Sequence, residues 1–206
     1  MTIQEIINKF EIWTDDMTEL STDDELFLAN KINRDIYIEQ DWEFLRKNQT
    51  GVTDSNGEIP VPIDFEKFMQ NYSKEETKDE GSLPDTCVVF ISGNPYKIIP
   101  AGSKNLYVGD AVCYYDSLTR TIKFPTSVGV GANYEFDYKY IPVDLELTDS
   151  PLFSYNVHQI IFYGMLIDDE IIQKVEKARS FMNVNSAMYN KYLSKLKLID
   201  ASLFFN

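Results

Sequence analysis

The sequence contains few of the residues from which catalytic and metal-binding sites are usually built. It has one histidine, His158, and two cysteines, Cys87 and Cys113. It has no histidine pair, no nucleophile motif and no redox pair of cysteines. We therefore expect no enzyme activity, no catalytic residue, no cofactor and no metal ligand. His158 lies in an apolar helical stretch and is predicted to be a hydrogen-bonded packing residue. The cysteines lie in strand-like runs and are predicted to be reduced core residues.

Long apolar runs are also missing. No run approaches the ~20 residues that a membrane-spanning helix needs. Residues 3–10 alternate between apolar and polar at helical spacing, unlike a secretory signal sequence. We therefore expect no membrane association and a chain made in a cytoplasm, where it folds. A composition that is 44% hydrophobic and 14% aromatic is that of a folded protein.

Two short polar patterns resemble ligand sites but lack essential parts. Residues 127–133 contain two glycines, without the Lys-Ser/Thr pair of a phosphate loop. This pattern is typical of a hairpin connection. Asp54, Asn56 and Glu58 resemble the start of a calcium loop, but the downstream ligands are absent. The Asn56-Gly57 pair predicts a tight turn there instead.

Acidic residues are abundant, and their distribution is uneven. The net charge is −14, and residues 171–206 hold six basic side chains against two acidic ones, so the first 170 residues carry −18. Such a charge repels phosphate, which disfavours tight nucleic-acid binding. Close carboxylates such as Asp64 with Glu66, or the run 168–170, keep a metal-dependent hydrolase open as an alternative. An acidic DNA-mimic binding protein is a second alternative.

The first 45 residues read as two helices and an aromatic cluster. Thr2 is predicted to cap a helix over residues 2–13, and Thr22 with Glu25 forms a predicted capping box for the next. Its buried face is expected to contain Leu28, Ala29, Ile32 and Ile36. Trp42, Phe44 and Leu45 then form an aromatic knuckle, which is expected to plug the junction of two layers.

From residue 49 to residue 142 the period becomes that of extended strands. The pattern predicts hairpins over 87–99, with a turn at 93–95, and over 111–124, followed by a strand at 134–140 that alternates aromatic with charged residues. Pro60 and Pro62 predict an edge strand, because neither can donate a ladder hydrogen bond. The expected product is an antiparallel sheet or small barrel.

Helical patterns return after Pro142. One buried helix is predicted over 157–172 and another over 185–201, whose inner face carries Met188, Tyr192, Leu196 and Ile199. The predicted fold is therefore α+β. A helical bundle formed by residues 1–48 and 143–206 would carry an inserted β domain at 49–142.

The C-terminal end combines basic and apolar residues. Lys191, Lys195 and Lys197 precede an apolar hook formed by Leu203, Phe204 and Phe205. Aromatic side chains near a chain end are effective anchors in the groove of another subunit, so these six residues are predicted to contact a partner. The alternative is that the hook covers the protein's own helices.

Several segments, taken in order, resemble those of one protein family. The chain is similar to the head-to-tail adaptor (neck ring) proteins of tailed bacteriophages, the tail tubular protein A-like group. The segments that carry the resemblance are residues 26–34 (LFLANKINR), 41–45 (DWEFL), 59–65 (IPVPIDF), 114–116 with 122–124, 138–145, and 189–196.

The resemblance implies a structural virion protein without enzymatic activity. Members of this family form rings, commonly of twelve subunits, between the portal protein and the tail. The implied partners are copies of the chain itself, the portal protein and a downstream tail or neck protein, with genomic DNA passing through unbound. The implied location is the head-to-tail junction of the virion, after synthesis in the host bacterial cytoplasm.

Overall fold

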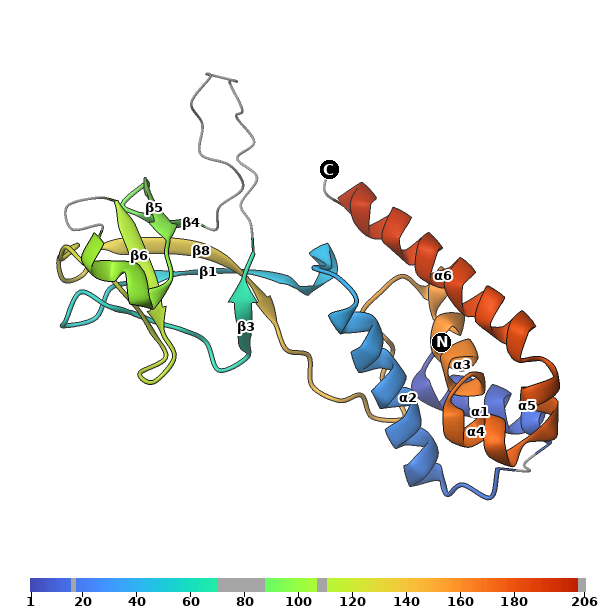
Figure 1. The fold of residues 1–206 in the computed structure, drawn as a ribbon. Helices are drawn as coiled ribbons and strands as arrows, with labels where there is room; N and C mark the ends of the chain where they lie inside the picture. The colour runs from blue at the N-terminus through green and yellow to red at the C-terminus, as the bar shows by residue number, and fades with distance from the viewer. Residues whose placement is uncertain (16–17, 70–87, 107–110, 204–206) are drawn as a thin grey trace. The chain divides into compact units, whose positions relative to one another are not determined.

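The computed structural model describes residues 1–15, 18–69, 88–106 and 111–203. The protein is a mixed α+β structure, shown in Figure 1. It divides into two compact units. The helical unit comprises Met1–Phe44 and Val143–Asn206, and the sheet unit comprises Leu45–Pro142.

The helical unit begins with α1 (Ile3–Thr14) and α2 (Thr22–Ile38). The predicted cap of α1 is confirmed, because the Thr2 hydroxyl accepts from the Glu5 amide while the Glu5 carboxylate accepts from the Thr2 amide. The predicted capping box of α2 was wrong by one residue. Ser21 and Asp24 make the reciprocal bonds, because the same three-residue spacing also occurs one position earlier.

The predicted core face of α2 is confirmed. Its members are all buried: Leu28, Ala29, Ile32 and Ile36. Their spacing of three and four residues places them along one side of the helix. This side packs against α1 and α3.

The second half of the helical unit consists of η3 (Tyr155–Val157), α3 (Gln159–Leu166), α4 (Asp169–Lys174), α5 (Glu176–Ser180) and α6 (Met182–Leu203). The single helix predicted over 157–172 is interrupted, because the Asp168 side chain accepts from the Glu170 amide and starts α4 as a new helix. α3 is the central helix and contacts α1, α2 and α6 (Figure 1).

The last helix, α6, is longer than the predicted 185–201. On its inner side Leu196 is fully buried, while Met188, Tyr192 and Ile199 are half-buried. Buried Asn185 and Asp200 complete this side. The predicted face is therefore correct in position but more polar than expected.

A short helix, η1 (Glu43–Leu45), spans the boundary between the two units in the sequence, and the described part of the sheet unit contains η2 (Ala101–Leu106) and eight strands. The strands are β1 (Arg46–Val52), β2 (Ile59–Pro60), β3 (Phe65–Phe68), β4 (Val88–Ile91), β5 (Asn94–Ile98), β6 (Val112–Asp116), β7 (Thr121–Lys123) and β8 (Asn133–Tyr140). Their order is β1-β8-β4-β5-β6-β7-β2, and β3 also pairs with β8. β1 begins three residues before the predicted boundary at 48/49.

The sheet is nearly closed, and one of its strand pairs is parallel. All pairs are antiparallel except β5 with β6, so the prediction of an antiparallel sheet was incomplete. The chain between β5 and β6 includes η2, and a connection of that length can cross over as a tight hairpin cannot. β2 is the last strand of the path, which confirms that Pro60 lies in an edge strand.

The two tight turns predicted from the sequence, at Asn56-Gly57 and at residues 93–95, can be compared with the structure. The Asn56-Gly57 turn is confirmed, since Gly57 has φ +74° and its amide donates to the Asp54 carbonyl. The turn predicted at 93–95 lies one residue earlier, at Ser92-Gly93, where both residues have positive φ. This is the backbone of a two-residue primed turn, and it leaves Asn94 and Pro95 inside β5.

The core of the sheet unit is largely aromatic. Tyr134, Phe136 and Tyr138 of β8 are buried as the alternation predicted. Phe65 and Phe68 of β3 pack on them with ring centroids about 5 to 6 Å apart. The alternation of aromatic and charged residues along β8 does not correspond to burial at Lys139. This side chain is buried and pairs with Glu66 on β3 at 3.5 Å.

A close approach between α2 and α3 depends on Gly164. A Cβ atom at this position would lie 2.3 Å from Cγ2 of Ile32. Ile32 is β-branched and buried, so it cannot move that methyl group aside cheaply. The absence of a side chain at position 164 is therefore what lets the two helices pack at this distance.

We expect Gly164→Ala to destabilise the protein by about 1–3 kcal/mol, because overpacking exceeds the gain in helix propensity. Urea unfolding measures this change. Gly102→Ala is the matched control, since a Cβ there meets no atom within 4 Å. Ile32→Ala combined with Gly164→Ala should cost less than the sum of the two single changes. A Gly164→Ala protein as stable as the wild type would contradict the packing described.

Candidate functional site

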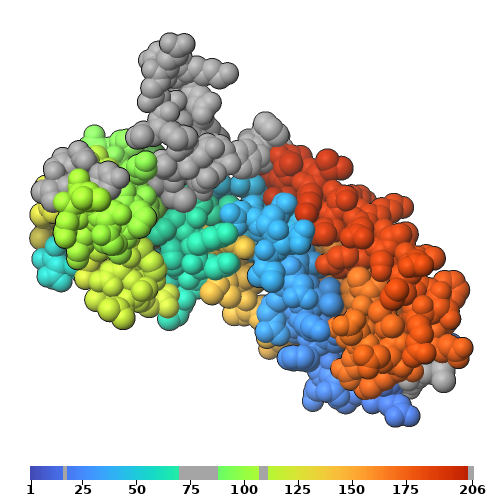
Figure 2. Space-filling model, in the orientation of Figure 1, coloured from blue at the N-terminus to red at the C-terminus, as the bar shows by residue number. Residues whose placement is uncertain are grey.

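The outward side of α6 carries a stripe of exposed side chains. Lys191, Lys195 and Leu198 follow one another at spacings of four and three residues, so they share one face of the helix. Leu198 is 74% exposed. Figure 2 shows a long side of α6 open to solvent. We call Lys191, Lys195 and Leu198 the α6 stripe.

The two lysines of the stripe have no carboxylate within ion-pair distance among the described residues. Most other described cations are neutralised within the chain. The paired cations include Lys31 with Asp168, Lys47 with Asp64, Lys123 with Asp116, Lys139 with Glu66, Lys174 with Glu170, Lys177 with Asp15, Lys197 with Glu39, Arg34 with Asp144 and Arg46 with Asp137. Lys191 and Lys195 are therefore two exposed ammonium groups, without a described ion-pair partner, beside an exposed leucine in a chain of net charge −14.

The remaining predicted contact residues lie elsewhere. Lys197 points toward α2, where its ammonium group donates to Glu39 at 2.8 Å. Leu203, the last residue of α6, is 50% exposed. Phe204 and Phe205 lie outside the described residues. The predicted set therefore divides into two outward lysines, one intramolecular lysine and one half-exposed leucine.

The aromatic knuckle forms a packed cluster at the end of α2. Trp42 is fully buried, and its indole N–H donates to the Ile36 carbonyl at 2.6 Å. Its ring stacks on Phe44 with centroids 5.3 Å apart. Phe153 packs edge-on against Phe44 at 6.0 Å. Leu45 is also fully buried, so all three predicted knuckle residues are packing residues.

Asp200 holds the knuckle to α6, and sequence reasoning missed it. Its Oδ1 atom accepts from the backbone amides of Glu43 at 2.8 Å and Phe44 at 3.3 Å. Burial raises the pKa of the Asp200 carboxyl group, and these amide hydrogen bonds oppose the rise. The only local signal was an acidic residue on the apolar side of a helix, which does not reveal an acceptor for amides 156 positions away.

His158 is a packing residue, as its apolar context predicted. Its Nε2 atom lies 2.7 Å from the Phe153 carbonyl and its Nδ1 atom 3.0 Å from the Met1 carbonyl. The buried ring packs edge-on against Phe153, with centroids 5.6 Å apart, and lies tilted against Tyr155 at 5.5 Å. Burial lowers the pKa of the imidazole, although both carbonyls oppose this shift.

The carboxylates considered as metal ligands make contacts within the protein. Asp64 accepts from Lys47 at 2.6 Å and from the Tyr138 hydroxyl at 3.0 Å, and the Lys47 bond lowers the pKa of Asp64. Asp54 accepts from the amides of Asn56 and Glu58, which closes the turn. Within the residues that the structure describes, no three or more His, Cys, Asp and Glu side chains gather where they could hold a metal ion.

Cys113 is a free, fully buried thiol in β6, and burial raises its pKa to about 12. It is therefore protonated and unreactive at neutral pH, as expected of a small core residue. Cys87 lies outside the described residues.

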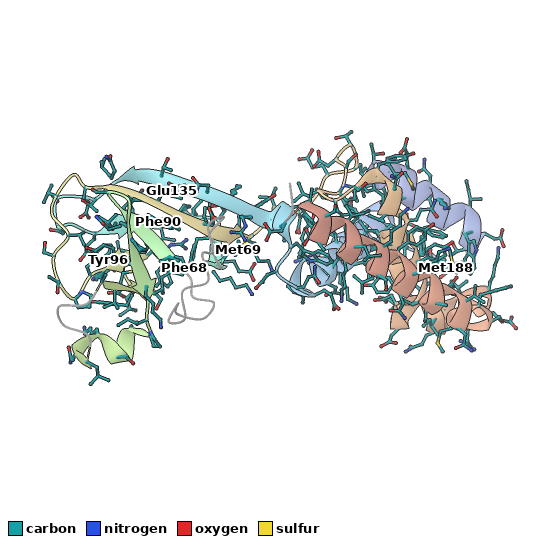
Figure 3. The ribbon with its side chains drawn as sticks, turned by 90° about the horizontal axis from the view of Figure 1, so that it is seen from above. Phe68, Met69, Phe90, Tyr96, Glu135 and Met188 are labelled. Carbon is teal, nitrogen blue, oxygen red and sulfur yellow. The ribbon has the colours of Figure 1, made fainter. Side chains whose placement is uncertain are left out.

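The described residues line a shallow cavity in each unit. The cavity of the sheet unit, of about 830 Å³, is lined by β1, β4 and β8, including Phe90 and Glu135, which are cross-strand neighbours (Figure 3). The cavity of the helical unit, of about 270 Å³, lies beside Lys31, Asp168 and Tyr189. Lys31 already pairs with Asp168 at 2.7 Å, and this hydrogen bond raises the pKa of Lys31.

No family model and no curated protein matches this chain. In the described ranges, no helix combines the length and apolar character needed to cross a membrane.

We expect Asp200→Ala to lower the free energy of unfolding by about 1–3 kcal/mol, because two amides lose their acceptor. Asp200→Asn should cost less, since its amide oxygen still accepts. Chemical denaturation at neutral pH measures both. Ser194→Ala, at an exposed position of the same helix, is the control. An alanine variant with unchanged stability would show that the knuckle does not need this carboxylate.

We also expect stability to fall as the pH drops below the ordinary histidine pKa of about 6.5. The folded-state pKa of His158 is lowered, so the unfolded chain takes up the proton first and is favoured by acid. His158→Gln should therefore lose less stability than the wild type between pH 7.5 and pH 5, which denaturation at a series of pH values measures. Equal losses in the two proteins would contradict this assignment.

Proposed function

We propose that this chain is a structural subunit that forms a ring with copies of itself, as a head-to-tail adaptor between the portal and the tail of a bacteriophage. The observation that carries the proposal is the α6 stripe. An exposed leucine that follows two lysines without an ion-pair partner among the described residues is suited to an acidic partner surface, and this chain carries a large excess of acidic residues.

Charge complementarity favours contact between copies. In a head-to-tail contact, the basic stripe of one subunit meets a different, acidic face of its neighbour, and such a contact closes into a ring when the rotation per subunit is suitable. The helical unit supplies exposed acidic side chains for that face, among them Asp23 and Asp35 on α2. A helical bundle that carries the sheet unit as an insertion would then be the ring-forming part.

The net negative charge of the chain is suited to the lining of a DNA channel. Carboxylates that line a bore repel phosphate, so a genome would pass through without adhering. In this proposal the acidic part of the chain lines the bore. The sheet unit reaches the neighbouring subunit or the tail protein, while α6 and Leu203 engage the portal protein or the next subunit.

The test is charge reversal on the stripe. We expect Lys191→Glu with Lys195→Glu to abolish ring formation and portal binding while the monomer stays folded. Native mass spectrometry of the purified chain, with and without a portal protein, measures the assembly, and circular dichroism measures folding. Lys97→Glu with Lys104→Glu changes the net charge equally on the sheet unit and is the control.

Full-size rings from the stripe variant would contradict the assignment of the contact. A monomer that binds stoichiometric Mg²⁺ or Mn²⁺ would favour a metal-dependent hydrolase instead. A one-to-one complex with a nucleic-acid-handling protein would favour a DNA mimic.

A further inference from the structure

The strand β1 is an open edge of the sheet. It pairs with β8 over all seven of its residues, and on its other side no described strand pairs with it. Thr50, Gly51 and Val52 are exposed, and Val52 is 56% exposed. The cavity of the sheet unit borders these three residues.

The hydrogen bonds of β8 show which groups of β1 face outward. The carbonyls of Asn133 and Asp137 accept from the amides of Ser92 and Met69, so odd-numbered residues of β8 bond away from β1. Even-numbered residues of β8 therefore bond β1, because alternate residues point their backbone groups to opposite sides of a strand.

The register then assigns the groups of β1. The even-numbered residues of β8 face Lys47, Gln49 and Gly51. Consequently Asn48, Thr50 and Val52 direct their backbone N–H and C=O groups away from β8, in the plane of the sheet and toward its open edge. The Thr50 carbonyl receives one long bond of 3.3 Å from the Gln49 side chain.

Among the described strands, the other sheet edges carry protective features that the β1 edge lacks. β2 has two residues, one of them Pro60, and β3 is interrupted by a register shift between Phe65 and Lys67. Prolines, short strands and bulges are the usual protections against edge pairing. β1 contains no proline. The ammonium group of its Lys47 donates to Asp64 at 2.6 Å and lies 4.0 Å from the centre of the Tyr140 ring.

We infer that β1 pairs with β1 of a second copy of this chain, antiparallel and centred on Thr50. In that register Thr50 faces Thr50 of the other copy, and Asn48 faces Val52. Each outward N–H then meets an outward carbonyl, and each facing pair exchanges two hydrogen bonds.

The facing side chains suit self-pairing. Asn48, Thr50 and Val52 are uncharged, so no like charges face each other across the two-fold axis. Threonine pairs are also favourable across antiparallel strands. The nearest acidic residues, Glu135 and Asp137, are held by Asn48 on the same sheet at 3.0 and 2.8 Å.

This pairing is independent of the proposed ring. A two-fold axis relates two copies face to face, whereas a ring contact repeats in one direction. The pairing therefore describes the free chain, in which it covers an edge that would otherwise recruit other strands.

Disulfide trapping of the full chain tests the pairing and its register. Cα atoms of a hydrogen-bonded antiparallel pair lie about 5.5 Å apart, within the range that a disulfide bridges. Thr50→Cys should form a covalent dimer under mild oxidation faster than Gln49→Cys, whose two copies would not face each other. Leu118→Cys, which is 95% exposed on the same unit, measures random collision.

A second variant tests the backbone bonds. Thr50→Pro removes an N–H that β8 does not use, so the monomer should still fold. The dissociation constant of the dimer should rise about tenfold or more. Analytical ultracentrifugation measures the dimer. Trapping of Thr50→Cys no faster than Leu118→Cys would overturn the inference, as would a wild type that stays monomeric at its highest soluble concentration. If Lys191→Glu with Lys195→Glu abolished the dimer and Thr50→Pro did not, the dimer contact would lie on α6 and the inference would be wrong.

Discussion

The carboxylate of Asp200 joins the last helix to the end of α2, and this contact decides which side of α6 is exposed. Asp200 accepts from the amides of Glu43 and Phe44, and on the same helix Leu196 is buried while Lys197 pairs with Glu39. Because Leu196, Lys197 and Asp200 all contact the rest of the helical unit, the opposite side of α6 faces solvent. The surface that we propose for assembly is therefore a consequence of an internal hydrogen bond.

The polar character of this anchor has a physical reason. A buried carboxylate is costly to desolvate, as the raised pKa of Asp200 indicates, and it is tolerated because two amides satisfy it. Those amides begin η1, directly beside the buried Trp42 ring. The knuckle predicted from its aromatic residues is thus completed by a polar residue from the far end of the chain.

Local signals predicted local structure well. The Thr2 cap, the buried face of α2 and the Asn56-Gly57 turn all depend on residues within a few positions of one another, and all three are present. Near misses have the same origin. Ser21 and Thr22 both satisfy a capping pattern, and only packing selects between them.

Contacts between distant residues could not be predicted in this way. The parallel pairing of β5 with β6 depends on a crossover, and the burial of Lys139 depends on Glu66 on a neighbouring strand. Of the candidate site, the basic residues of α6 were visible in the sequence. The fold was needed to show which of these lysines have no ion-pair partner among the described residues, and that Leu198 lies exposed on the same face. The open edge of β1 likewise follows from strand order.

We propose that this chain works by assembly and not by bond-making. Electron cryomicroscopy of the head-to-tail junction in intact phage particles that carry this chain tests it most directly. We expect a closed ring of density between portal and tail into which copies of the helical unit fit, with the α6 stripe buried at a contact. A junction without the chain, or with the α6 stripe facing solvent in every copy, would contradict the account.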